Sequence, residues 1–330
     1  MKKHFYILLF LFLTLLIGCN KQQTIDKIQL QGAVFGTTYS VIYLNDDTNY
    51  QKEINSLFDE INTSLSTYSA TSDISKINKG NTSIIVDDYF LEVFKKSKKI
   101  FAETNGYFDP TVGGLVNAYG FGPEHEIEEF TSNKLDSLMH FVGLNKVKIV
   151  NRIVVKENPE IYLDFNSIAK GYAVDIIANF LEQKKLKNYL VEIGGEIRAK
   201  GTNDKQNPWR IGIDDPNEDD TRTITRLIDL SNESIASSGN YRKFKIDADG
   251  NKFVHTINPK TGLARESNLL AATVIGKMDC ADADGYATAF MAMGLEKTKK
   301  FVEENDRVKV ILFYLNSEGK IEEFSNYNED

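Results

Sequence analysis

The sequence predicts an α+β fold in which mixed, largely antiparallel sheets are packed against helices. Two observations support this class. Short strand-like runs follow one another across tight turns, as the strands of hairpins do. Helical patterns lie between these runs without the regular strand–helix alternation of a parallel α/β protein. The chain has 330 residues, 42% of them apolar, and is therefore long enough to bury a large core.

The expected strands are short runs of β-branched and aromatic residues bounded by glycine, asparagine or proline. The first run breaks into two strands at Gly36, and Asn151-Arg152 separates two later runs as the turn of a hairpin. These runs cover residues 31–44, 147–150, 153–155, 161–165, 191–199, 209–213, 223–230, 270–275 and 308–314.

The expected helices show apolar side chains at helical spacing. The second of them ends before Asn105-Gly106, a typical helix stop. The helical patterns cover residues 51–65, 87–103, 169–180 and 283–304. Residues 107–122 have no period but are rich in glycine and aromatic residues, which indicates backbone that closely approaches a ligand or another segment.

The N-terminus has the pattern of an export signal. Two lysines precede a nearly unbroken apolar run over residues 5–18, which is shorter than the roughly 20 residues of a membrane-spanning helix. The run ends in LIGC at residues 16–19, which resembles the lipobox of bacterial lipoproteins, where the cysteine carries acyl chains such as palmitate. An ordinary signal peptide followed by a chance cysteine is the alternative interpretation.

We therefore expect a lipoprotein signal peptide at residues 1–18, a lipidated polar tether at residues 19–30 and one functional domain at residues 31–330. The protein would be exported and anchored through Cys19 to a bacterial cell membrane, facing the periplasm or the exterior. Cys280 is then the one remaining cysteine, which excludes an intramolecular disulfide, and we expect its thiol to be a small buried group.

Charge and motifs exclude several function classes. The formal net charge is −8, and removal of the signal peptide would make it −10, so broad affinity for nucleic acid is not expected. The sequence contains no Walker P-loop, no dinucleotide-binding glycine fingerprint and no Gly-x-Ser-x-Gly nucleophile elbow. The histidines after the signal are widely spaced, which argues against a histidine-rich zinc site. An anionic ligand would have to be bound by local groups.

One segment dense in polar groups, residues 163–171, runs from an expected strand into a helix. It places Asp164 and Lys170 beside the free backbone N–H groups of a helix start, which suits a phosphate or a ribose hydroxyl. The alternative is a helix capped by Asp164 or Asn166 with Lys170 in solvent.

Two further segments carry single groups of interest. Asp284 and Thr288 are four residues apart on one helix face, where a carboxylate and a hydroxyl can share a hard cation such as Mg²⁺. A helix cap is the alternative role for Asp284. His255 lies where a strand ends in a Pro/Gly turn; at a cleft it could move a proton near neutral pH, although a lone histidine is more often structural.

Together these segments resemble the ApbE-type FAD:protein FMN transferases, or flavin transferases. The similarity covers residues 32–316, and the motifs occur in the order of the family. The motifs are residues 35–39 (FGTTY), 66–68 (STY), 108–113 (FDPTVG), 115–117 (LVN), 120–123 (GFGP), 164–175, 193–196 (IGGE), 238–242 (SGNYR), 255–262 and 283–289.

The resemblance implies a T-fold-like architecture and Mg²⁺-dependent transfer of FMN from FAD to a Thr or Ser hydroxyl of an exported or membrane acceptor protein. The product would be a phosphoester-linked flavin, and AMP would be released. The implied acceptors are flavoproteins such as subunits of ion-pumping redox complexes, and no nucleic acid is involved. By the family pattern, FAD contacts fall at Phe35, Tyr68, Tyr107, Phe108, Asp109, Asp164, Lys170 and Ile257.

The same pattern places the metal, Mg²⁺ or alternatively Ca²⁺, against Ser167, Asp284 and Thr288. His255 is the candidate for handling the proton of the acceptor or leaving group, and Arg242 would lie near the phosphates. Two other functions stay open: a metal-dependent FAD pyrophosphatase that gives FMN and AMP, and a non-enzymatic FAD-binding lipoprotein. The chain departs from the common family pattern at Phe35 for Met, Gly114 for Pro, Tyr119 for Trp and Asn258 for Asp.

Overall fold

The computed structural model describes residues 26–124, 131–214, 216, 224–240, 244–246, 252–264 and 267–327. The expected signal peptide, Cys19 and Arg242 lie outside these residues. Within the described ranges, every helix is too short or too polar to cross a membrane.

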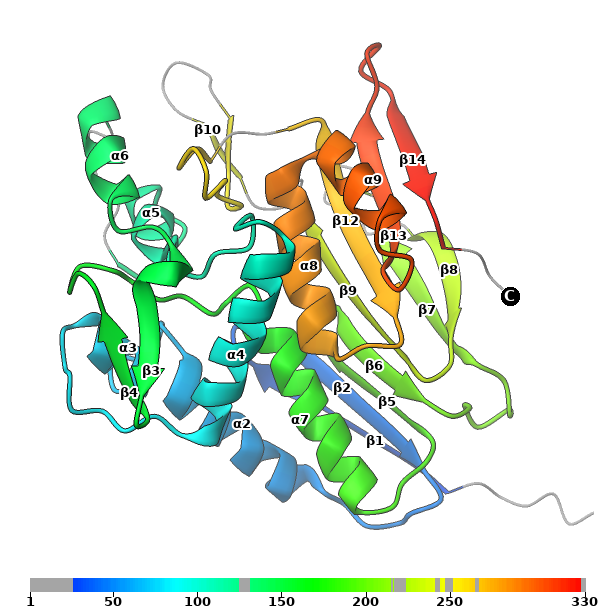
Figure 1. Cartoon of the computed structure of the whole chain (residues 1–330). Helices are drawn as coiled ribbons and strands as arrows, with labels where there is room; N and C mark the ends of the chain where they lie inside the picture. The colour runs from blue at the N-terminus through cyan, green and yellow to red at the C-terminus, as the bar shows by residue number, and fades with distance from the viewer. Residues whose placement is uncertain are drawn as a thin grey trace, which may run out of the picture.

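An eight-stranded sheet forms the centre of the fold, with strand order β1-β2-β5-β6-β9-β12-β13-β14 (Figure 1). Every neighbouring pair in this sheet is antiparallel. Its strands are β1 (Lys27–Val34), β2 (Thr37–Leu44), β5 (Tyr189–Ile193), β6 (Glu196–Lys200), β9 (Glu233–Gly239), β12 (Leu269–Gly276), β13 (Lys309–Leu315) and β14 (Ile321–Ser325).

Three two-stranded sheets complete the strand inventory of the described residues. They are β3 (Val147–Val150) with β4 (Ile153–Lys156), β7 (Trp209–Asp214) with β8 (Ile224–Leu230), and β10 (Phe244–Ile246) with β11 (Lys252–Val254). The helices are α2 (Gln51–Leu65), α3 (Asp73–Asn78), α4 (Asp88–Glu103), α5 (Gly113–Ala118), α6 (Ser132–Met139), η1 (Leu144–Lys146), α7 (Ala169–Gln183), α8 (Cys280–Met293) and α9 (Leu295–Glu303). Helices and antiparallel sheets confirm the α+β prediction.

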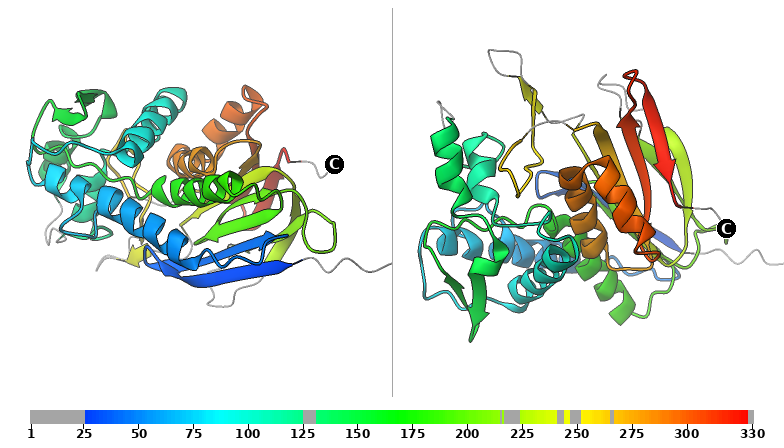
Figure 2. Two further views of the ribbon diagram at one scale, coloured as in Figure 1. Left: turned by 90° about the horizontal axis from the view of Figure 1, so that it is seen from below. Right: turned by 45° about the horizontal axis from the view of Figure 1, so that its top comes forward.

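Each face of the central sheet buries its own apolar core. Helices α2, α7 and α8 lie on one side of the sheet, as the left view of Figure 2 shows. Side chains alternate along β2: Tyr39, Val41 and Tyr43 belong to the core under the helices, whereas Ile42 and Leu44 belong to the core that includes residues of β7 and β8. The fold is therefore layered, with helices on one face of the sheet and a β-ribbon on the other.

Two of the expected strands differ from the structure. Residues 161–165 are not a strand: Tyr162 makes one isolated bridge to Val112, and the N–H of Asp164 donates to the carbonyl of Pro110. Loop contacts therefore take the hydrogen-bonding groups that a sheet would use. The expected run 191–199 is a hairpin, because two glycines with positive φ turn the chain between β5 and β6.

The start of the first strand and the capping of α7 also differ from the expectation. β1 begins at Lys27, four residues before the expected start of the first strand run, because its pairing with β2 extends over eight residues of each strand. Helix α7 begins at Ala169 without a side-chain cap among the described residues. Asp164 instead accepts a hydrogen bond from the N–H of Asn166, 2.8 Å away, and so closes a turn before the helix.

Helices α7 and α8 approach each other most closely at Gly171. A Cβ atom at this position would lie 2.4 Å from the carbonyl oxygen of Cys280 and 2.8 Å from the Cβ of Asp284. Both neighbours belong to the first two turns of α8, and one is rigid backbone. The crossing of the two helices therefore requires a residue without a side chain.

Gly171→Ala is expected to lower the free energy of unfolding by about 1–3 kcal/mol, because the added methyl group overpacks the helix crossing. Gly114→Ala is the matched control in α5, where the nearest atom would lie 3.9 Å away, and it should be neutral or slightly stabilising. Urea unfolding of both variants measures the difference. Equal effects would contradict the tight crossing.

Candidate active site

A cleft of about 1330 Å³ brings the expected site residues together. Its lining comes from the hairpin of β5 and β6, from the N-terminal parts of α7 and α8, and from the loops around residues 107–109 and 255–259. Every expected site residue that the structure describes lines it, namely Phe35, Tyr68, Tyr107, Phe108, Asp109, Asp164, Ser167, Lys170, His255, Ile257, Asp284 and Thr288.

A buried group of charges lies at the base of this cleft. The Lys170 ammonium forms an ion pair with Oε1 of Glu196, the first residue of β6. Glu196 is 2% exposed, and its Oε2 atom has no hydrogen-bond partner among the described residues. Oδ2 of the buried Asp284 accepts a hydrogen bond from the N–H of Gly171 at 3.0 Å. Lys170, whose side chain is 33% exposed, is therefore held in an ion pair at the cleft surface, and Asp284 does not cap its own helix.

The balance of charge in this group is negative. Burial raises the pKa of Glu196 to about 7, and burial also raises the pKa of Asp284. Burial alone would lower the pKa of Lys170, but the carboxylates of Glu196 and Asp284 outweigh it and raise this pKa. Two carboxylates thus share one ammonium. A further cation bound here would relieve the excess negative charge.

Hydroxyl groups extend the oxygen-rich base of the cleft. Thr288 lies one turn after Asp284 in α8, and its hydroxyl is 3.3 Å from that of Ser238 in β9. Ser167 lines the same cleft just before α7. In the described part of the chain, no three His, Cys, Asp or Glu side chains gather closely enough to hold a metal ion. A cation here would depend on hydroxyl or backbone oxygens as well as on carboxylate.

Aromatic side chains form another part of the wall. Phe35 has a φ of +50° in the two-residue turn between β1 and β2, and its ring packs edge-on against Phe58 at 5.7 Å between centroids. Tyr68 is 61% exposed and therefore presents its ring to the cleft. Lys297 lies 4.8 Å and Lys260 5.8 Å from the centroid of the Tyr107 ring. Neither lysine is among the described residues that line the cleft, so the aromatic wall itself suits a flat ligand.

Asp109 is occupied by its own loop. Its Oδ1 atom accepts hydrogen bonds from the N–H and the hydroxyl of Thr111, at 2.9 and 2.6 Å, and its Oδ2 atom accepts one from the N–H of Leu144 at 3.2 Å. Burial raises the pKa of this carboxyl, which these hydrogen bonds oppose. The side chain orders the loop behind Phe108, and its contact with a ligand stays a prediction.

His255 lies at a structured corner. It follows the last residue of β11, and the hydroxyl of the next residue, Thr256, donates to Oδ1 of Asn240 at 2.9 Å. The N–H groups of Thr261 and Gly262 both bond to the carbonyl of Asn258, which tightens the turn beyond. The half-buried imidazole therefore faces the cleft from a fixed backbone.

The remaining cysteine is inert, as expected. Cys280 has no exposed surface, and burial raises the pKa of its thiol. Sequence reasoning assigned no role to Glu196 or Ser238, although both lie in the quoted motifs. The sequence does contain a signal for the burial of Glu196. This charged residue directly follows two glycines and stands between Ile193 and Ile197, which are both buried.

Comparison with known proteins identifies the family of this chain. The model of the ApbE family matches residues 35–312. An FAD:protein FMN transferase of Vibrio cholerae is 36% identical over 315 residues, which is 93% of this chain and 92% of that protein. One of Haemophilus influenzae is 36% identical over 305 residues, covering 88% of this chain and 87% of its own length.

Solved structures show the same fold. The flavin transferase ApbE from Vibrio cholerae superposes with a TM-score of 0.81 at 34% identity and covers 91% of this chain and 97% of its own. The apo form of the Pseudomonas stutzeri flavinyl transferase ApbE gives a TM-score of 0.82 at 28% identity and covers 92% and 96%. The sequence match, the shared fold and the cleft residues together show that this chain belongs to the ApbE family of flavin transferases.

Proposed function

We propose that the protein transfers FMN from FAD to a Thr or Ser hydroxyl of an acceptor protein, in a Mg²⁺-dependent reaction that releases AMP. The observation that carries this proposal is the union, in one cleft, of an aromatic wall with a carboxylate–ammonium group of net negative charge. The wall suits the flavin and adenine rings. The relatives that match over most of the chain are named for this transfer.

The donor set of the cleft fits Mg²⁺. All of the groups at its base that could bind a cation are oxygens, the ligands that Mg²⁺ prefers, and Oε2 of Glu196 lacks a partner among the described residues. Asp284, Thr288 and Ser167 would hold the ion, with Glu196 balancing its charge nearby. Ca²⁺ accepts the same oxygen ligands. When bound, the ion would neutralise charge on the pyrophosphate and help to orient it.

The residues of the chain supply positioning and proton transfer. Lys170, in the first turn of α7, would lie beside the phosphates, where its ammonium and the positive end of the helix dipole favour an anion. His255 would accept the proton of the acceptor hydroxyl. The oxygen of that hydroxyl would at the same time form a bond to the phosphorus of the FMN half. The bond between this phosphorus and the bridging oxygen of the pyrophosphate then breaks, and AMP leaves with the bridging oxygen as part of its phosphate. Arg242 is proposed to lie near the phosphates.

The cellular setting is also a proposal. A lipid-anchored protein with Cys19 as its first mature residue would act outside the cytoplasm, on exported or membrane flavoproteins such as subunits of ion-pumping redox complexes. The apolar run and the LIGC sequence support this proposal. Globomycin treatment of cells, followed by immunoblotting, tests it: accumulation of the unprocessed form supports the anchor, and normal processing contradicts it.

Incubation of the purified protein with FAD, Mg²⁺ and an exported acceptor flavoprotein is expected to add one FMN mass to the acceptor. Asp284→Ala should slow this transfer by about 100-fold or more, because a catalytic metal contributes several kcal/mol of transition-state stabilisation. The circular dichroism of this variant should stay close to that of the wild type, and its melting temperature should fall modestly, because the N–H of Gly171 loses its acceptor. Mass spectrometry of the acceptor measures the reaction. Rapid release of free FMN without an acceptor would instead indicate a hydrolase.

His255→Gln is expected to lower the rate of transfer by about 10²–10⁴-fold and to remove a titration near neutral pH from the rate profile. His140→Gln, at the end of α6 where the exposed imidazole forms a hydrogen bond with the carbonyl of Asp136, is the matched control. A pH–rate profile of each variant checks the role. A profile of His255→Gln that keeps the wild-type shape would exclude His255 as the base.

Stability should depend on pH through Glu196. Without metal, the wild type should lose stability as the pH rises from about 5 to about 7, because the folded state holds the Glu196 proton to about pH 7 and the unfolded chain releases it near 4.5. Mg²⁺ binds the deprotonated site, so it should raise the melting temperature more at about pH 8 than at about pH 6.

Glu196→Gln should make both pH dependences shallower without abolishing them, because Glu196 no longer titrates while burial still raises the pKa values of Asp284 and Asp175. Glu60→Gln, on the exposed face of α2, is the control that should retain them. Thermal melts with EDTA or with MgCl₂ measure each variant. Identical slopes for wild type and Glu196→Gln would show that another group titrates.

A further inference from the structure

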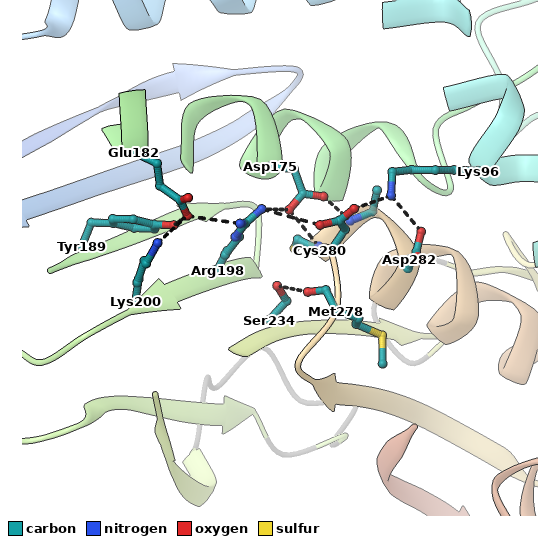
Figure 3. A network of polar contacts seen from close by, with 12 residues as sticks. Lys96, Asp175, Glu182, Tyr189, Arg198, Lys200, Ser234, Met278, Cys280 and Asp282 are labelled. Atoms are coloured by element: carbon teal, nitrogen blue, oxygen red, sulfur yellow. Dashed lines mark hydrogen bonds and ion pairs between the residues drawn. The ribbon is translucent and has the colours of Figure 1, made fainter. Parts of the chain in front are cut away.

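A carboxylate behind the cleft anchors the beginning of α8. Asp175, in α7, is 3% exposed and is not among the described residues that line the cleft. Its Oδ1 atom accepts a hydrogen bond from the N–H of Cys280, and its Oδ2 atom accepts one from the N–H of Ala281, each at 2.9 Å (Figure 3). Asp279, at the N-cap position of α8, makes no side-chain cap in the described structure, so Asp175 replaces it from another helix.

The arrangement is reciprocal. While Asp175 of α7 accepts from the start of α8, Asp284 of α8 accepts from the N–H of Gly171 near the start of α7. In each helix the accepting carboxylate lies four residues, or one turn, after the N–H that the other helix binds. The two helix N-termini therefore satisfy each other, across a crossing that only glycine permits.

The Asp175 carboxylate is itself fixed by its surroundings. Arg198 of β6 donates from Nη1 to Oδ1 of Asp175 at 2.9 Å and reaches Glu182 with Nη2 at 3.3 Å. On the far side, Lys96 of α4 pairs with Asp279 at 2.6 Å and with Asp282 at 3.1 Å (Figure 3). The first turn of α8 is therefore attached to α4, α7 and the sheet.

We propose that Asp175 is a positioning residue of the transfer reaction: by holding the first turn of α8, it sets where Asp284 and Thr288 stand at the base of the cleft. This inference rests on the proposed function, since it concerns the residues expected to bind the metal. Asp284 is one turn from Cys280 and Thr288 is two turns from it. A helix shift at Cys280 is therefore transmitted to both oxygen ligands, because a helix moves as a rigid rod over two turns.

Asp175→Asn tests this proposal, because the amide keeps the size of the side chain but turns one acceptor into a donor facing a backbone N–H. Glu182→Gln is the matched control. This carboxylate also lies on α7 and also binds Arg198, but among the described residues it forms no hydrogen bond or ion pair with α8 (Figure 3). The first readout is backbone amide exchange in the metal-free full chain. The second is the dissociation constant of Mg²⁺ alone, measured by calorimetry.

In Asp175→Asn, we expect the amides of Cys280 and Ala281 to exchange faster, and also that of Gly171, whose partner is Asp284. The dissociation constant for Mg²⁺ should rise by about 10- to 100-fold, as it does when groups that orient metal ligands are removed. Glu182→Gln should leave both readouts near those of the wild type. If Asp175→Asn does not fold, Arg198→Lys replaces it, with changes in the same direction.

Two results would overturn the proposal. One is wild-type protection of Gly171 in Asp175→Asn while Cys280 and Ala281 lose theirs, which would make Asp175 a cap and nothing more. The other is an unchanged Mg²⁺ dissociation constant in this variant. If the wild type itself binds no Mg²⁺, the metal part of the proposed function fails, and the exchange of Gly171 still decides whether Asp175 positions Asp284.

Discussion

The close crossing of α7 and α8 is the constraint on which the site depends. Gly171 lets the helix backbones meet, and the carboxylates of Asp175 and Asp284 then satisfy the N–H groups that each helix start exposes. Both carboxylates are buried, where an unpaired charge is costly, so the hydrogen bonds between the helices are needed in both directions. Because the crossing brings two helix starts to one place, it also brings Lys170 and Asp284 together.

The acidity of the whole chain and the handling of an anionic substrate are compatible at this site. The formal net charge is −8, yet the base of the cleft presents an ammonium, the positive end of the α7 dipole and oxygen ligands for a cation. Local groups, not the overall charge, would determine binding of a pyrophosphate. The unpartnered oxygen of Glu196 and the raised pKa values of Glu196 and Asp284 have one shared cause: two carboxylates are buried beside a single ammonium.

The family context supports the same reading of the cleft. Members with solved structures are flavin transferases, and this chain matches them over nine-tenths of its length. Phe35, which replaces the common Met, lies in a turn at positive φ and still lines the cleft, so the substitution keeps an apolar side chain at that place. Tyr119 belongs to an apolar cluster that includes Ile257, and the carbonyl of Asn258 closes a turn; neither residue is among the described ones that line the cleft.

The sequence by itself determined the class of the fold and the order of the motifs, because periodicity and short motifs are local properties, and the family resemblance implied twelve of the residues that line the cleft. The prediction of a strand at residues 161–165 was wrong. Their backbone groups bond to Pro110 and other loop groups instead of to a sheet, and these contacts are visible only in three dimensions. Only the tertiary structure decided that Lys170 pairs with Glu196, and that Asp175 and Asp284 cap each other's helices. These contacts join residues far apart in the chain, and no spacing in the sequence encodes them.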